Sequence, residues 1–205
     1  ATLAPLLSVL LFLSAIVVAI TYLRFEELER EQEAVTRDVE YAQQRLRMRL
    51  LERQEQVMRL ARDVSNKEIR TDQFLSRAEA LVQQYPEFLS LTWIDDRRRI
   101  MANQSVSSIS PSQRLRAGTV LKVGETESHF SLARDLMQPI YGQIDTDTDK
   151  DAQLAVLQLH TPLSNDQGRF SGVILAEYTM EGLLRYGIPT EVLAKYAVAL
   201  QDSKG

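Results

Sequence analysis

The chain shows its fold most clearly in QLAVLQLHTPLS (153–164) and RFSGVILAEYTM (169–180), which NDQG (165–168) joins. In the first run, Leu157 and Leu159 alternate with Gln158 and His160, which is typical of a β-strand with two unlike faces. The second run is of similar length and is equally rich in strand-forming residues. Because Asn-Asp-Gln-Gly is a hairpin turn sequence, the two runs predict a pair of long antiparallel strands.

Helices and shorter strands are expected on both sides of this hairpin. Two strands joined by a tight turn at Asp96 and Arg97 precede it, and a last strand follows it at 196–201. The expected helices are 71–85, which Pro86 closes, 128–142, which stops near Pro139, and 181–196, which is interrupted near Pro189; the strands are 88–96 and 98–103, and the loops are 104–118 and 145–151. This order predicts an α+β domain, in which a small antiparallel sheet has helices on one face and a long stalk helix on the other.

The N-terminal part predicts a membrane helix. Leu3 to Leu23 carries no charge, and a helix of this length reaches about 30 Å, close to the thickness of the hydrocarbon core of a bilayer. The alternatives are a cleaved signal peptide, whose apolar core is usually shorter, and a buried core helix. The flank RFEELEREQE lacks the cationic excess of a cytoplasmic loop. We therefore expect a bacterial inner-membrane anchor, with the residues after about 24 in the periplasm.

A long stalk helix is expected to follow without a break. Glu26 to Ser65 contains neither Gly nor Pro, and apolar residues recur at steps of three, four or seven. The resulting stripe suits either a dimeric coiled coil or packing against the chain's own sheet. The expected segments are a transmembrane helix at 1–23, the stalk at 24–65, a first sensor domain at 66–188, and a connecting helix with the first strand of a second, truncated domain at 189–205.

The expectation of a second domain comes from a local repeat. LTWIDDRRRI (91–100) and YAVALQDSKG (196–205) are both alternating strands that follow a helix and lead into an acidic, polar turn. The second stretch is therefore interpreted as the opening strand of another copy of the domain.

Composition excludes several functions. Net charge is −4 and no basic tract stands out, which argues against nucleic acid as a partner. There are no cysteines and only two histidines, and no common catalytic motif occurs, so no catalytic residue, cofactor or metal is predicted. The acidic run DTDTDKD (145–151) resembles the start of an EF-hand loop, but Lys150 and Val156 stand where that loop needs Gly and Glu.

A ligand site is expected where polar residues interrupt an apolar strand face. Gln158 and His160 share one face of their strand with Val156, and such residues either meet water or line a pocket. His160 suits a carboxylate ligand, although a structural histidine is the simpler alternative. For the other candidates the alternatives are core packing, loop capping or a surface ion pair. The candidate ligand-binding residues are Trp93, Asn103, Arg134, Tyr141, Gln158 and His160; His129 lies on the same predicted helix as Arg134.

Three segments resemble a known family. They are LERQEQVMRLARD (51–63), YPEFLSLTWIDDRRRIMAN (85–103) and the run from LQLHTPLS (157–164) to AKYAVALQDSKG (194–205). Together they resemble the extracytoplasmic sensor region of bacterial membrane-bound histidine kinases of the C4-dicarboxylate sensor type, with tandem PAS-like (Cache-like) domains. The resemblance implies that 66–188 is a first PAS-like domain and that a second sensor domain, a second membrane helix and cytoplasmic kinase modules are missing.

The resulting hypothesis is the ligand-sensing region of a homodimeric two-component histidine kinase. It would bind a small anionic metabolite, such as a dicarboxylate, and signal across the membrane through the long helix. The alternatives are the sensor region of a chemoreceptor or a cyclic-dinucleotide enzyme, a membrane-tethered coiled-coil scaffold that binds a protein, and a dimerisation domain without a ligand.

Overall fold

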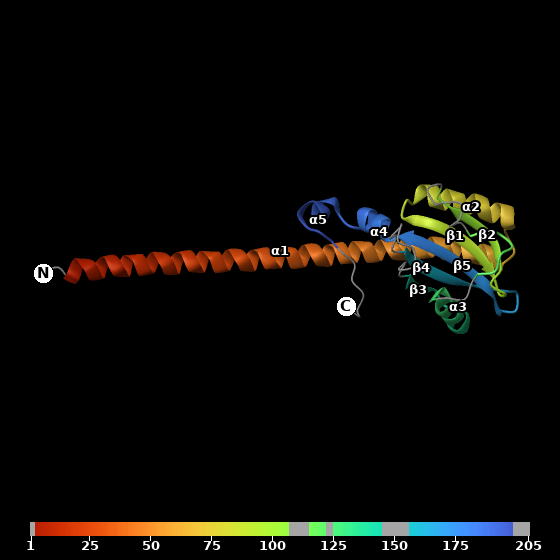
Figure 1. Ribbon diagram of the computed structural model, residues 1–205, viewed down its shortest axis with the longest axis horizontal. Coiled ribbons are helices and arrows are strands. Elements are labelled where there is room, and N and C mark those ends of the chain that lie inside the picture. Colours follow the sequence, from red (N-terminus) through yellow and green to blue (C-terminus); the bar gives the residue numbers. More distant parts are fainter. Residues whose placement is uncertain (1–2, 107–114, 122–124, 145–155, 199–205) are drawn as a thin grey trace. The chain divides into compact units, whose positions relative to one another are not determined.

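The computed structural model describes residues 3–106, 115–121, 125–144 and 156–198. These contain five helices and five strands (Figure 1). The helices are α1 (Leu3–Ser65), α2 (Thr71–Gln84), α3 (Glu125–Leu136), α4 (Met180–Gly187) and α5 (Thr190–Lys195), and the strands are β1 (Phe88–Asp95), β2 (Ile100–Ser105), β3 (Ile140–Ile144), β4 (Val156–Ser164) and β5 (Phe170–Thr179).

The long N-terminal helix is confirmed as one element, α1, of 63 residues. It ends where the sequence predicts, because Lys67 adopts a left-handed φ of 59° and its backbone N–H donates to the carbonyl of Val64. The chain forms two compact units, Ala1–Gln44 and Arg45–Gly205. Among the described residues no helix is both long enough and apolar enough to cross a membrane, so the predicted span is not confirmed.

The second unit is built on one antiparallel sheet in the order β2-β1-β5-β4-β3. The predicted hairpin forms its centre, where β4 and β5 pair from Val156 opposite Thr179 to Ser164 opposite Phe170. The turn has the expected chemistry, since Gly168 adopts a φ of 71° and the Asn165 side chain accepts the backbone N–H groups of Gln167 and Arg169.

The main core lies on one face of the sheet. It joins Val57 and Leu60 of α1 and Phe74 of α2 to Leu91 and Ile174 on the central strands. Figure 1 shows α2 alongside β1 and β2. The sequence predicted the stalk helix and the other helices on opposite faces. That prediction was wrong for α2, because α1 and α2 cover the same face; we call it the α1/α2 face.

A smaller core lies on the opposite face. There, Phe130 and Ala133 of α3 pack against Ile94, Val173 and Leu175. We call this the α3 face. Strand alternation decides which residues share it, because successive side chains of a strand point to opposite faces.

The structure corrects two further predictions. β3 was missed: Ile140, Tyr141 and Gly142 were assigned to the end of a helix, but that helix ends at Leu136 and these residues pair with β4. The strand predicted at 196–201 is not observed at 196–198, and the rest of that stretch lies outside the described residues, as does the acidic loop 145–151.

Candidate functional site

Polar side chains form two rows across the α3 face. Cα partners place Ser105, Ser90, Glu177 and Gln158 in one row across four strands, with Gly142 at its end. At about 4.8 Å between strands, this row spans on the order of 19 Å. The neighbouring row runs Asn103, Thr92, Leu175, His160 and Ile140.

Hydrogen bonds tie the first row together at Glu177. Ser90 Oγ donates to Glu177 Oε2 at 2.6 Å, and Gln158 Nε2 donates to Glu177 Oε1 at 2.9 Å. Both donors are buried, so the carboxylate is held from two sides by side chains of neighbouring strands. In the second row, Asn103 Nδ2 donates to Thr92 Oγ1 at 2.6 Å.

Helix α3 adds one imidazole to these rows. His129 lies directly over Gly142, since a Cβ built at Gly142 would be 2.5 Å from the His129 ring. The centroids of the His129 and His160 rings are 5.8 Å apart. Gly142 therefore allows α3 to approach the sheet closely at this point. We call the following set the polar cluster: Ser90, Thr92, Asn103, His129, Gln158, His160 and Glu177.

Several buried atoms of the polar cluster have no hydrogen-bond partner. They are His160 Nδ1 and Nε2, Gln158 Oε1 and His129 Nδ1. Burial, with a smaller effect of the neighbouring His129, lowers the pKa of His160 to about 4, so the imidazole of His160 is neutral at pH 7. Buried polar atoms are almost always paired in native proteins, and an unpaired one costs free energy. The polar cluster thus has hydrogen-bonding capacity that the described residues leave unused.

The sequence-based candidates separate into two groups. Asn103, Gln158 and His160 lie in the polar cluster. Trp93 and Tyr141 lie on the α1/α2 face, where Trp93 is 5.8 Å from Phe74 between ring centroids and Tyr141 is the Cα partner of Leu159.

Arg134 also lies apart from the polar cluster. It is an exposed residue of α3 whose Nε lies 2.8 Å from Asp135 Oδ1, so it forms the surface ion pair that was its alternative interpretation.

Sequence reasoning missed Glu177, Ser90 and Thr92. Two signals for Glu177 were available: it follows Val173 and Leu175 at steps of two, and it is the only charged residue of its strand. What the sequence did not supply was the register that sets Glu177 between Ser90 and Gln158.

A buried ion pair joins α1 to Glu87. This residue directly precedes β1, the strand that carries Ser90 and Thr92 of the polar cluster. Glu87 accepts from Arg53 Nε at 2.7 Å and from Arg49 Nε at 3.1 Å, and both arginines belong to α1. Arg49 also donates to the backbone carbonyl of Tyr186, near the end of α4. Burial alone would raise the pKa of Glu87, but these hydrogen bonds outweigh it, and the pKa lies below its ordinary value. The pair fixes α1 to the residue before β1.

Comparisons with solved structures identify the fold. An extracellular ligand-binding receptor from Desulfohalobium retbaense superimposes with a TM-score of 0.50 and 15% identity, over 69% of this chain and 25% of that one. The ligand-binding domain of the Campylobacter jejuni chemoreceptor Tlp3, in complex with 4-methylisoleucine, gives 0.51 and 14%, over 77% of this chain and 60% of that one. This chain has the fold of a receptor sensor domain.

A third similar structure is the extracellular domain of a protein described as a histidine kinase, rpHK1S-Z16. Its TM-score is 0.50 at 14% identity, and the match covers 73% of this chain and 58% of that one. No family model and no curated protein matches the sequence. The matched part of this chain corresponds to between a quarter and three fifths of the length of these three solved chains. The Cache-like fold that the sequence resemblance implied is supported, while the C4-dicarboxylate kinase type is not.

Proposed function

We propose that this chain is the ligand-sensing region of a bacterial membrane receptor, and that a small polar molecule binds at the polar cluster. The observation that carries the proposal is the set of buried, unpartnered polar atoms on His160, Gln158 and His129. The α1/α2 face of the same sheet carries the main core, with a hollow at its edge that is lined by Val64, Trp93 and Leu163. A ligand that pairs with these atoms would repay the cost of burying them.

The similar structures support this class of function. Their names describe an extracellular ligand-binding receptor, a chemoreceptor domain with a bound amino-acid derivative and an extracellular kinase domain. We accordingly propose a periplasmic sensor, anchored to the inner membrane by residues 1–23 and acting as a homodimer. A histidine kinase is the output that the sequence resemblance favours, and a chemoreceptor is the alternative.

Signalling would run from the sheet to α1. Glu177, in the polar cluster, is followed directly by Tyr178, whose ring stacks on Phe88 with centroids 4.8 Å apart. Phe88 follows Glu87, which α1 holds through Arg49 and Arg53. A ligand that prefers one position of β5 would thereby bias the position of α1.

Thermal melts of the full 205-residue chain test the proposal. The chain is kept in a mild non-ionic detergent because its first residues are apolar, and it is screened against small carboxylates, amino acids, amines and sugars. A compound at 100 times its dissociation constant adds about 2.7 kcal/mol to the free energy of unfolding, which is several degrees in Tm.

Substitutions locate the binding site. Asn103→Ala and His160→Gln should each weaken the response, whereas Asn66→Ala should leave it unchanged, because Asn66 is an exposed residue that bonds to Glu68. A compound that binds the three variants and the wild type equally well would place its site elsewhere and contradict the proposal.

A further inference from the structure

The hydrogen-bonding capacity left in the polar cluster consists mainly of acceptors. Gln158 Oε1 can only accept, and its own Nε2 already donates to Glu177. A neutral imidazole at His160 offers one acceptor and one donor, and the remaining unpartnered atom, His129 Nδ1, donates or accepts according to which ring nitrogen carries the proton. The Glu177 carboxylate has further lone pairs beyond the two bonds it accepts from Ser90 and Gln158.

The charge of the polar cluster also favours a ligand that donates hydrogen bonds and is positively charged. Glu177 is half-buried, and among the described residues it takes part in no ion pair. The polar cluster contains no arginine or lysine, and burial lowers the pKa of His160 to about 4. Charges removed from water are normally paired, so a half-buried carboxylate that only neutral donors contact lacks its natural partner.

We propose that the ligand of this sensor carries a protonated amine, and that Glu177 binds it. This inference rests on the proposed function and names the chemical class of the ligand. The ammonium group would donate to Glu177, and its remaining N–H groups match the unpartnered acceptors on Gln158 and His160, which face the same side of β4.

A dicarboxylate fits the same residues poorly. Each of its carboxylates needs donors, and the unpartnered buried atoms of the polar cluster offer at most two imidazole N–H groups, one on His160 and one on His129. Its charge would also face Glu177, and like charges at short range repel. The sequence-based expectation of an anionic metabolite rested on His160 and did not take Glu177 into account.

Four compounds with the same four-carbon chain provide the test. They are 1,4-diaminobutane, 4-aminobutanoate, succinate and 1,4-butanediol, and they differ in the groups at the chain ends, which are ammonium, carboxylate or hydroxyl. Binding to the wild-type 205-residue chain is measured by thermal melts and calorimetry. We expect at least one of the two amines to bind, and neither succinate nor the diol. This comparison involves no variant, so it does not depend on how a substitution affects folding.

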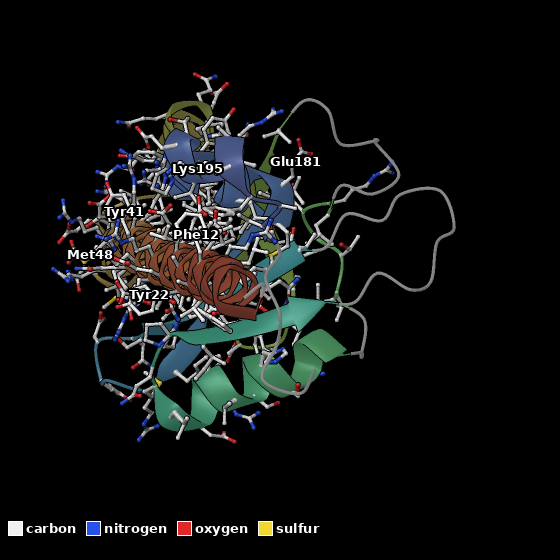
Figure 2. The ribbon with its side chains drawn as sticks, turned by 90° about the vertical axis from the view of Figure 1, so that its left-hand side faces the viewer. Phe12, Tyr22, Tyr41, Met48, Glu181 and Lys195 are labelled. Carbon is white, nitrogen blue, oxygen red and sulfur yellow. The ribbon has the colours of Figure 1, made fainter. Side chains whose placement is uncertain are left out.

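Glu177→Gln identifies the carboxylate. It keeps the shape of the side chain and removes the charge, and it should weaken the binding of the amine at least tenfold. Glu181→Gln is the matched control: Glu181 lies on α4, its side chain is 74% exposed, and Figure 2 labels it. That variant should bind within twofold of the wild type. Circular dichroism of both variants checks that they fold.

Each other result overturns the inference. If succinate alone binds, or if an amine binds Glu177→Gln as tightly as the wild type, the ligand class is wrong while the sensor function stands. If no amine in the set, and none of the twenty common amino acids, binds the wild type, the inference fails. If the carboxylates and sugars of the wider screen fail as well, the proposed function falls with it.

Discussion

His160 makes stability depend on pH. It is fully buried next to His129 of α3, and its pKa is lowered to about 4 by burial and, to a smaller extent, by this neighbour. In the unfolded chain its pKa is about 6.5. Between these two values the unfolded state binds more protons than the folded state, so stability is lost as pH falls from about 6.5. From pH 7 to pH 5 the loss due to His160 is about 2 kcal/mol.

Urea unfolding at pH 7 and pH 5 measures this loss. His160→Gln has no group to protonate at that position, so its free energy of unfolding should change less between the two pH values. An equal change in variant and wild type would show that His160 is not buried in its neutral form.

Gly142 is a second residue whose role is local and testable. Gly142→Ala puts a methyl group 2.5 Å from the His129 ring, so the ring or the strand must move. We expect a loss of about 1–3 kcal/mol in the free energy of unfolding. The same substitution in a His129→Ala background should cost much less, which a double-mutant cycle of urea melts measures. Equal costs in both backgrounds would contradict the close approach.

At the residue scale, the sequence predicted part of the candidate site. Alternation along one strand identified Gln158 and His160, because that signal is contained within a few residues. Glu177 belongs to the candidate site because it pairs with Ser90 and Gln158 on two other strands. A single sequence does not reveal this register across the sheet. Trp93 shares its strand face with Leu91, so alternation already indicated the core for it.

At the element scale, the elements that carry their own start and stop signals were predicted well. α2 ends before Pro86, α4 and α5 are separated at Pro189, and the β4–β5 hairpin follows from its turn. β3 was missed because it has five residues, includes Gly142 and directly follows Pro139. Such a strand is defined by pairing with β4 and by contact with α3, which are tertiary effects.

The attachment of α1 to the sheet is an element-scale feature with a measurable energy. Glu87→Gln leaves Arg53, whose side chain is 9% exposed, without its buried carboxylate. Breaking a buried pair in this way costs about 3–5 kcal/mol. Glu55→Gln is the control, because Glu55 and Arg59 form an exposed pair on the same helix, worth at most about 1 kcal/mol. Urea melts compare the two variants, and similar losses would contradict a buried linkage.

The pH dependence of this attachment has a definite direction. The pKa of Glu87 is lowered on folding, so its contribution to stability is complete above the ordinary pKa of 4.5 and is lost as pH falls through the folded value. This window begins at about 4.5, near the lower end of the window in which His160 acts, so acid titrations of His160→Gln and Glu87→Gln distinguish the two groups.

At the scale of the whole molecule, one sheet separates the polar cluster from the helices that would carry the signal. Trp93 is the only tryptophan, and it lies on the α1/α2 face against Phe74, away from the polar cluster. Its fluorescence therefore reports the packing of the helices on the sheet without reporting contact with a ligand.

If binding shifts the sheet against α1 and α2, a saturating ligand should change the emission of Trp93. The coupling requires the ligand to prefer one arrangement of the core over another, and packed cores switch between discrete arrangements. The measurement is a fluorescence titration with whichever four-carbon amine binds in calorimetry. Glu177→Gln should move the midpoint of the titration and its calorimetric dissociation constant together. Heat of binding without any change in Trp93 would mean that the ligand occupies the α3 face and leaves the packing of α1 and α2 around Trp93 unchanged, and the proposed route from β5 to α1 would then be wrong.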